Sequence, residues 1–126
     1  MIWLATSHGL SRLDPDTGSA VRFQHKANDP SSLTNDFLRS TFEASDGTFW
    51  VAGNLALDVF DRFSGKVAQH FSLRNPLRRD ERTSANESVR LLQDHAGVLW
   101  VVSARDGLAM VLDVGQPAAI LYWAAA

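Results

Sequence analysis

The chain has 126 residues, 45% of them hydrophobic, so it is long enough to bury a core as a single domain. Its 14 acidic and 12 basic residues give a formal net charge of −2, which excludes an overall bias toward nucleic acid. Cysteine is absent, which excludes disulfides and thiolate metal sites. No apolar run approaches the roughly 20 residues of a membrane helix, and no signal peptide is visible.

The first elements in chain order are three short strands, which begin at Ile2, Leu10 and Ala20. The Ser7-His8 pair and the segment 14–18 (DPDTG) are typical of the turns between them. Met1 is followed directly by an apolar run that corresponds to the middle of a repeat and not to its start. We therefore expect the chain to be a fragment of a longer protein or to have a misplaced start.

Two further units of four strands each follow, because short β-rich runs alternate with Gly, Asp and Asn turns and no helical periodicity competes. The Asp46-Gly47 pair is the clearest hairpin signal, since both residues suit positive φ. The expected strands of the second unit are 37–43, 48–52, 57–60 and 66–72. Those of the third unit are 88–93, 98–102, 108–112 and 118–123.

Three stretches repeat this pattern, each anchored by a tryptophan: Trp3, Trp50 and Trp100, separated by 47 and 50 residues. A period of this length in a β-rich chain indicates propeller blades. The predicted fold is therefore all-β, a β-propeller segment of about three four-stranded antiparallel blades spanning 1–126, with repeats at about 1–34, 35–86 and 87–126. A propeller typically closes with about 4–8 blades, so this chain alone does not close the ring.

The repeated residues are interpreted as scaffold. The three tryptophans are expected to pack between neighbouring sheets, with sugar stacking as the alternative. Asp14 and Asp61 are expected to form side chain–backbone turns rather than to act as catalysts. The following residues complete this interpretation: Gly18, Gly47, Gly65 and Gly97 in turns, His25 in a structural loop hydrogen bond rather than as a ligand, and Trp123 in a last-strand core or a frayed end.

The residues also carry a family resemblance. The stretch 32–53 (SLTNDFLRSTFEASDGTFWVAG) resembles the repeat of the two-component regulator propeller family, and so does 9–18 (GLSRLDPDTG). The segment 23–33 (FQHKANDPSSL) keeps the family's order of an aromatic residue, histidine, Asp-Pro and Ser-Leu. The chain departs from the pattern at 55–57 (LAL), which lacks the Gly-Leu pair, and at 113–115, which has lost most of the last turn motif.

This resemblance implies the sensor region of bacterial hybrid histidine kinases and some diguanylate cyclases. Such regions lie outside the cytoplasm and receive ligands, often oligosaccharides, so the implied location is periplasmic. In that family two rings of about seven blades precede a β-sandwich, a membrane helix and an output domain, and this chain supplies at most a few blades. The implied partners are an oligosaccharide or another small ligand, and the remaining blades of a longer chain or copies of itself.

Catalytic chemistry is not indicated, since no phosphate-binding, zinc-protease or nucleophile-elbow motif occurs. The four histidines are scattered, so no metal site and no cofactor are expected. The candidate recognition surface is a pair of long loops, 26–35 and 73–86. The second gathers four arginines whose planar groups suit carboxylates, sulfates and sugar hydroxyls, or else form a solvated charged loop: Arg74, Arg78, Arg79 and Arg82.

The sequence is compatible with three functions. The first is a ligand-sensing propeller segment, and the second is a structural module that assembles with copies or a partner chain. The third is a propeller enzyme such as a lyase or sialidase. The sialidase motif S-x-D-x-G-x-x-W fits at Gly47 and Trp50, but Ser45 stands in place of its Asp and Glu43 in place of its Ser.

Overall fold

The computed structural model describes residues 1–54, 56–72, 89–103, 107–111 and 120–123. Every regular element in these ranges is a β-strand, and the strands form three antiparallel sheets. Sheet A holds three strands: β1 (Ile2–Thr6), β2 (Gly9–Leu13) and β3 (Ala20–Phe23). Sheet B holds four: β4 (Leu38–Glu43), β5 (Phe49–Gly53), β6 (Ala56–Asp61) and β7 (Lys66–Ser72). Sheet C holds four: β8 (Val89–Gln93), β9 (Leu99–Ser103), β10 (Gly107–Val111) and β11 (Ile120–Trp123).

The expectation of an all-β chain with units of three, four and four strands is confirmed in the described residues. Within each sheet every strand pairs with the next one in the chain, so each unit is a simple meander. The predicted bounds differ from the observed ones by two residues at most. One difference has a clear reason: Phe37 was expected to open a strand, but it is exposed, and the pairing starts at the buried Leu38.

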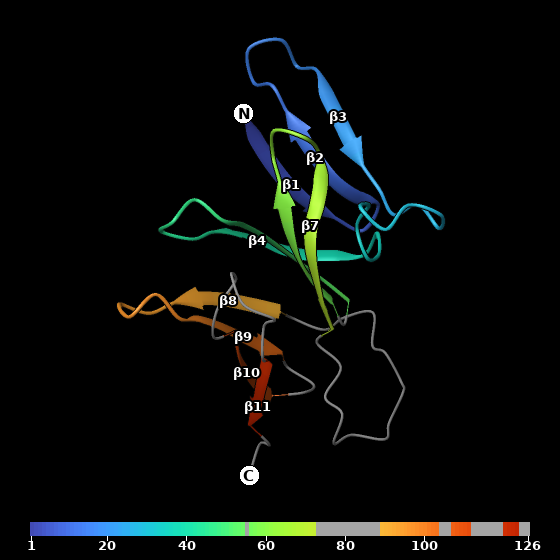
Figure 1. Ribbon diagram of the computed structural model, residues 1–126. Helices are drawn as coiled ribbons and strands as arrows, with labels where there is room; N and C mark the ends of the chain where they lie inside the picture. Colours follow the sequence, from blue (N-terminus) through green and yellow to red (C-terminus); the bar gives the residue numbers. More distant parts are fainter. Residues whose placement is uncertain (55, 73–88, 104–106, 112–119, 124–126) are drawn as a thin grey trace.

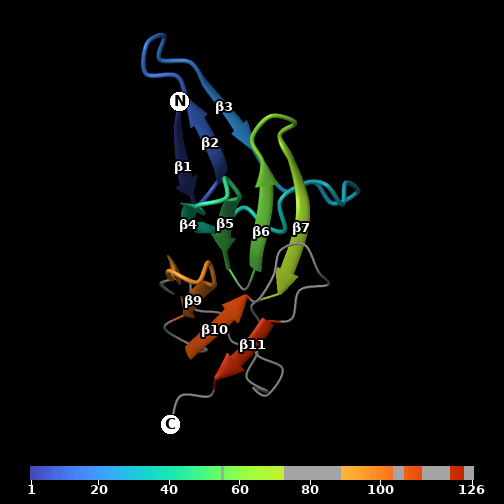
Figure 2. The ribbon, with the colours of Figure 1, turned by 60° about the vertical axis from the view of Figure 1, so that its left-hand side comes forward.

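The sheets follow one another through the molecule in chain order (Figure 1). Figure 2 shows sheet B between the other two, with β4 to β7 side by side. Strand β4 is the first strand of sheet B and contacts both β1 of sheet A and β8 of sheet C. Sheet B is therefore the central layer among the described sheets.

Two hydrophobic clusters hold the layers together. The cluster between sheets A and B contains Leu10, Leu33, Leu38, Phe49, Val51, Phe60 and Val67, with Trp3, Ala5 and Phe23 packed against it. The cluster between sheets B and C contains Ala44, Trp50, Ala52, Leu57, Phe71, Leu99 and Val101. Burial of apolar area at about 25 cal/mol per Å² is the main stabilising term in such clusters.

Strand β5 contributes to both clusters, because successive side chains of a strand point to opposite faces of its sheet. Phe49 and Val51 lie in the cluster shared with sheet A. Trp50 and Ala52 lie in the cluster shared with sheet C. All five residues of the strand are buried, which explains why its sequence is almost entirely apolar.

The expected packing of the tryptophans between sheets is confirmed for Trp3 and Trp50. Trp50 is 1% exposed, and its ring centroid lies 5.8 Å from that of Phe71. Trp3 is half-buried, with ring centroids 5.5 Å from Phe49 and 5.7 Å from Phe60 of sheet B. Each of these tryptophans faces the sheet that follows it in the chain.

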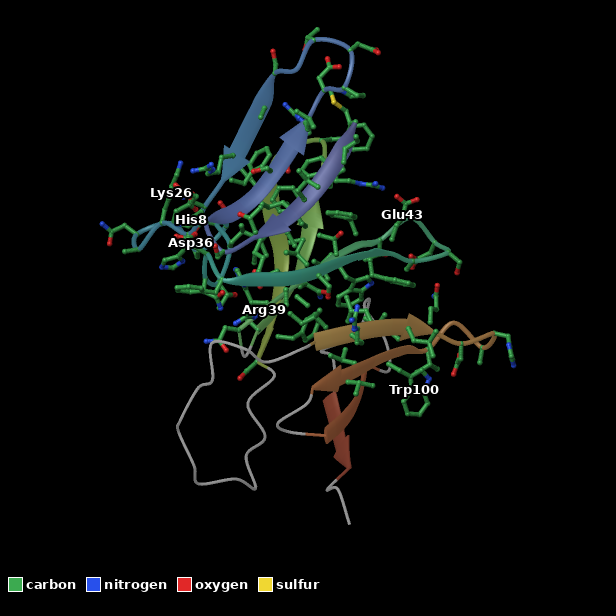
Figure 3. All side chains as sticks on the ribbon, turned by 180° about the vertical axis from the view of Figure 1, so that it is seen from behind. His8, Lys26, Asp36, Arg39, Glu43 and Trp100 are labelled. Atoms are coloured by element: carbon green, nitrogen blue, oxygen red, sulfur yellow. The ribbon has the colours of Figure 1, made fainter. Side chains whose placement is uncertain are left out.

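Trp100 has the same position in β9 but no following sheet among the described residues. Its neighbours Leu99 and Val101 face sheet B, so Trp100 lies on the opposite face, with Leu92 directly across on β8. Figure 3 shows it on the side of β8 and β9 away from β4. Trp100 is half-buried, and its Nε1 donates a hydrogen bond to Oδ2 of Asp94 at 2.8 Å.

Five glycines with positive φ lie in or beside the turns of sheets A, B and C. The expected turn glycines 18, 47, 65 and 97 all have positive φ, as predicted, and Gly9 joins them with φ of 106°. A Cβ on Gly9 would lie 2.3 Å from the carbonyl oxygen of Phe23, so β2 approaches β3 there more closely than a side chain permits. The expected turns at Asp14 and Asp61 are also confirmed, since each carboxylate accepts the amide N–H two residues later, from Asp16 and Phe63.

Candidate functional site

Of the two loops predicted as a recognition surface, 26–35 lies among the described residues, within the segment 24–37 that joins β3 of sheet A to β4 of sheet B and is named the linker loop. Its Asp29 opens a compact turn by accepting the amide N–H of Ser31 at 2.9 Å and the Ser31 hydroxyl at 2.6 Å. The Ser31 carbonyl in turn accepts the amide N–H of Val67 on β7 at 2.7 Å. The Asp-Pro-Ser-Ser sequence therefore folds the loop onto the outer strand of sheet B.

Asp58 of β6 is the one buried charged side chain among the described residues, and it is 2% exposed. Its Oδ2 accepts the amide N–H of Thr34 at 2.9 Å, and its Oδ1 accepts the Thr34 hydroxyl at 2.7 Å. A buried carboxylate is costly unless hydrogen bonds replace its water, and the linker loop supplies them. Asp58 therefore fixes the end of the linker loop to the middle of sheet B.

His70 lies directly across from Asp58 in the β6–β7 pairing and completes the cluster. Its Nδ1 is 2.8 Å from Oδ1 of Asp58, and its Nε2 is 2.7 Å from the carbonyl oxygen of Pro30. A carboxylate and a carbonyl oxygen accept hydrogen bonds, so a ring protonated on both nitrogens donates to each, and Nδ1 is also 2.7 Å from the Thr34 hydroxyl oxygen. We name the cluster of Asp58, Thr34 and His70 the loop clamp, and it gains an ion pair with Asp58 when His70 is a cation.

The pKa of His70 agrees with this geometry. Partial burial lowers the pKa, but the hydrogen bonds to the Pro30 carbonyl and to Asp58, together with the Asp58 charge, raise it above the ordinary value of 6.5. The net effect is a stabilised imidazolium beside a buried carboxylate.

A hollow of about 480 Å³ lies over the linker loop next to the clamp. Its lining includes His25, Lys26, Asn28, Pro30, Thr34 and His70. Nδ1 of His25 is not available to a ligand, because it forms a hydrogen bond with the Leu33 carbonyl oxygen at 2.6 Å. The expected structural hydrogen bond of His25 is therefore confirmed. Figure 3 shows Lys26 with His8 and Asp36 at this end of the molecule.

The predicted ligand-binding arginines, Arg74, Arg78, Arg79 and Arg82, all lie outside the described residues. Among the described residues, no group of three or more His, Asp or Glu side chains is arranged to hold a metal ion. No helix in these ranges is long and apolar enough to cross a membrane.

Sequence reasoning missed the loop clamp. The available signal was Asp58 inside the apolar run LDVF, where a carboxylate interrupts a strand of alternating apolar residues. His70 offered no comparable signal, because its role depends on pairing across β6 and β7 and on the linker loop reaching it.

A scan against protein-family models finds no match to this chain, and a search of curated proteins finds no relative. The search of solved structures does find similar folds. One is an extracellular domain assigned to a hybrid two component system from B. thetaiotaomicron, with a TM-score of 0.53 and 17% sequence identity. The match covers 95% of this chain and 22% of that domain, so the chain spans about a fifth of its length. At this identity the comparison shows similarity of fold.

Proposed function

We propose that the chain is a ligand-sensing β-propeller segment of an extracytoplasmic receptor, of the two-component or diguanylate cyclase type. In this proposal it responds to carbohydrate, has no catalytic activity and works in the periplasm. The observation that carries the proposal is the fold similarity over 95% of the chain to an extracellular domain assigned to a hybrid two component system.

The arrangement of the sheets supports the propeller. Antiparallel four-stranded meanders that pack face to face, each joined to the next by a loop from its last strand to the following first strand, are how blades succeed one another. The linker loop makes this connection between sheets A and B. Loops on a rigid scaffold commonly carry recognition, so in this proposal the linker loop and the predicted arginine-rich loop 73–86 contact the ligand.

The test of the sensor role is transcriptional. In the organism that encodes the chain, deletion of its codons in frame should abolish induction of a discrete set of genes by one class of carbohydrate. Replacement of Arg78 and Arg79 by alanine in the chromosomal copy should weaken the same response if the arginine-rich loop contacts the ligand. Unchanged induction by every carbohydrate tested, after the deletion, would contradict the sensor role.

An assembly module is the second candidate, because both outer faces of the stack carry apolar residues. On sheet A, Ile2 and Leu4 lie on the face away from sheet B and are 43% and 44% exposed. On sheet C, Leu92 and Val102 lie with Trp100 on the face away from sheet B, and both are exposed. Sheets A, B and C pack on one another through apolar faces of the same kind as these two outer faces. A second copy of the chain can therefore pack against either outer face and continue the stack.

Mass measurement by light scattering separates the two candidates. A closed oligomer of defined size supports the assembly module. A monomer that aggregates or unfolds supports a segment that needs the neighbouring blades of one chain.

A further inference from the structure

A second hollow, of about 250 Å³, lies between the outer edges of sheets A and B. Strand β3, the linker loop and the turn between β6 and β7 form its walls. We name it the edge hollow. It is separate in its lining from the loop clamp, since neither Asp58 nor His70 contributes to it.

Three cationic side chains line the edge hollow: Arg22 from β3, Lys26 from the linker loop and Lys66 from the start of β7. All three residues are exposed, and none forms an ion pair within the described part of the chain. Arg22 and Lys26 are four residues apart, and Lys66 lies 40 residues further along the chain. The fold therefore brings together positive charges that no neighbouring carboxylate neutralises by contact.

The one acidic residue in the lining is Asp29. Its Oδ1 already accepts both the amide and the hydroxyl of Ser31. The pKa of Asp29 is lowered first by these bonds, and also by the nearby charges of Lys26 and Lys66. Asp29 thus shapes the loop, and the hollow keeps an excess of two positive charges from its three cations and one carboxylate.

The inner wall of the hollow is apolar and fixed. Phe23, Leu33 and Phe60 contribute to it, and the last two are buried. The rings of Phe23 and Phe60 meet edge to face with centroids 5.2 Å apart. Gly65 lets the backbone approach Phe23, because a Cβ there would lie 2.7 Å from Cε1 of the ring.

We propose that the edge hollow binds a small organic anion one ring in size, with its carboxylate among Arg22, Lys26 and Lys66 and its ring against Phe23. The volume lies just below the range of about 300–1,000 Å³ that drug-sized ligands occupy, which suits a single ring. Guanidinium and ammonium groups recognise carboxylates through charge-assisted hydrogen bonds. The site deepens the proposed sensor role by naming a ligand class, and it rests on that role only for its meaning in signalling.

The experiment is a ¹⁵N–¹H NMR titration of the whole chain with two carboxylate probes, benzoate and D-glucuronate. At least one should produce saturable shifts at the amides of Lys26, Gly65 and Lys66. The neutral counterparts, benzamide and D-glucose, should not. Shifts that rise linearly without saturation for both acids, or equal shifts with the neutral compounds, overturn the proposal. If inorganic sulfate binds as tightly as the better acid, the apolar wall does not contribute to binding. That result also overturns the proposal.

Charge-removing variants test the cations. Arg22→Gln and Lys66→Gln together should weaken binding about tenfold, since two exposed charge contacts of about 0.7 kcal/mol each correspond to that factor. Arg90→Gln is the matched control, because Arg90 is also an exposed strand arginine but lies on β8, outside the hollow. Equal weakening by Arg22→Gln and Arg90→Gln would contradict the site.

The binding assay and the transcriptional test fail independently. Binding to the edge hollow without any regulated genes would leave the site standing and remove the sensor role. If the deletion abolishes gene induction but the edge hollow binds neither acid, the sensor role is kept and the proposed site is rejected.

Discussion

Nε2 of His70 lies 2.7 Å from the carbonyl oxygen of Pro30, a residue 40 positions earlier in the chain. This contact joins the last strand of sheet B to the tip of the linker loop. Because Nδ1 of the same ring bonds the buried Asp58 carboxylate, one side chain connects the loop to the interior of the sheet. Protonation of the ring makes the bond from Nδ1 to Asp58 an ion pair, and this makes the clamp sensitive to pH.

The free energy of unfolding should fall as pH rises from about 6.5 through the raised pKa of His70. The sign follows from linkage: the folded state holds the proton more tightly than the unfolded state, so the stabilisation is complete below the ordinary value and is lost above the raised one. Urea unfolding at a series of pH values measures this. His70→Gln should flatten the profile in that window, whereas His8→Gln, at an exposed turn, should leave it as it is. If the wild-type profile equals that of His70→Gln, the loop clamp does not make stability depend on pH.

Asp58→Asn should lower the free energy of unfolding by about 1–3 kcal/mol. The side-chain amide has one acceptor oxygen in place of two, and its NH₂ group would face the N–H groups of Thr34 or His70. Asp46→Asn is the matched control, since Asp46 caps an exposed turn by accepting the Thr48 amide and asparagine forms the same turn. Equal effects of the two substitutions on urea unfolding would show that burial of Asp58 is not important to stability.

Trp50→Ala should destabilise the fold by about 3–5 kcal/mol, as other large aromatic-to-alanine changes in a core do. Its ring fills the space between sheets B and C beside Phe71. Phe63→Ala is the control, because Phe63 is fully exposed in the turn after β6. The expected change there is close to zero. An unchanged melting curve for Trp50→Ala would place the indole outside the core.

Gly9→Ala and Gly47→Ala separate backbone strain from steric conflict. Both glycines have positive φ, which costs about 1–2 kcal/mol for alanine. A Cβ at Gly47 meets open space, but one at Gly9 meets the Phe23 carbonyl oxygen, so Gly9→Ala should cost about 1–3 kcal/mol more. Denaturant unfolding of the pair measures the difference. Equal losses would show that β2 and β3 separate readily at this point.

The strands were predictable from the sequence because their signals are local. Alternating apolar residues and turn dipeptides mark each strand, and the tryptophan repeat marks the units, so the three, four and four strands followed directly. The turns at Asp14 and Asp61 were predictable for the same reason, since an aspartate that caps a turn acts on its own backbone.

The loop clamp and the edge hollow were not predictable, because each depends on residues from separate elements. Asp58 and His70 meet only through the β6–β7 register, and Thr34 reaches them only when the linker loop folds over sheet B. Arg22 and Lys66 converge only when sheets A and B stack. Such contacts follow from tertiary packing, to which a single sequence gives no direct signal.

The double-sided burial of β5 has a consequence for how the chain opens. Phe49 and Val51 belong to one interlayer cluster and Trp50 and Ala52 to the other, so neither neighbouring sheet can detach without exposing part of β5. The three layers are therefore expected to unfold as one cooperative unit. In hydrogen exchange the amides of β5 should be the slowest to acquire deuterium, and they should do so only when the whole stack comes apart.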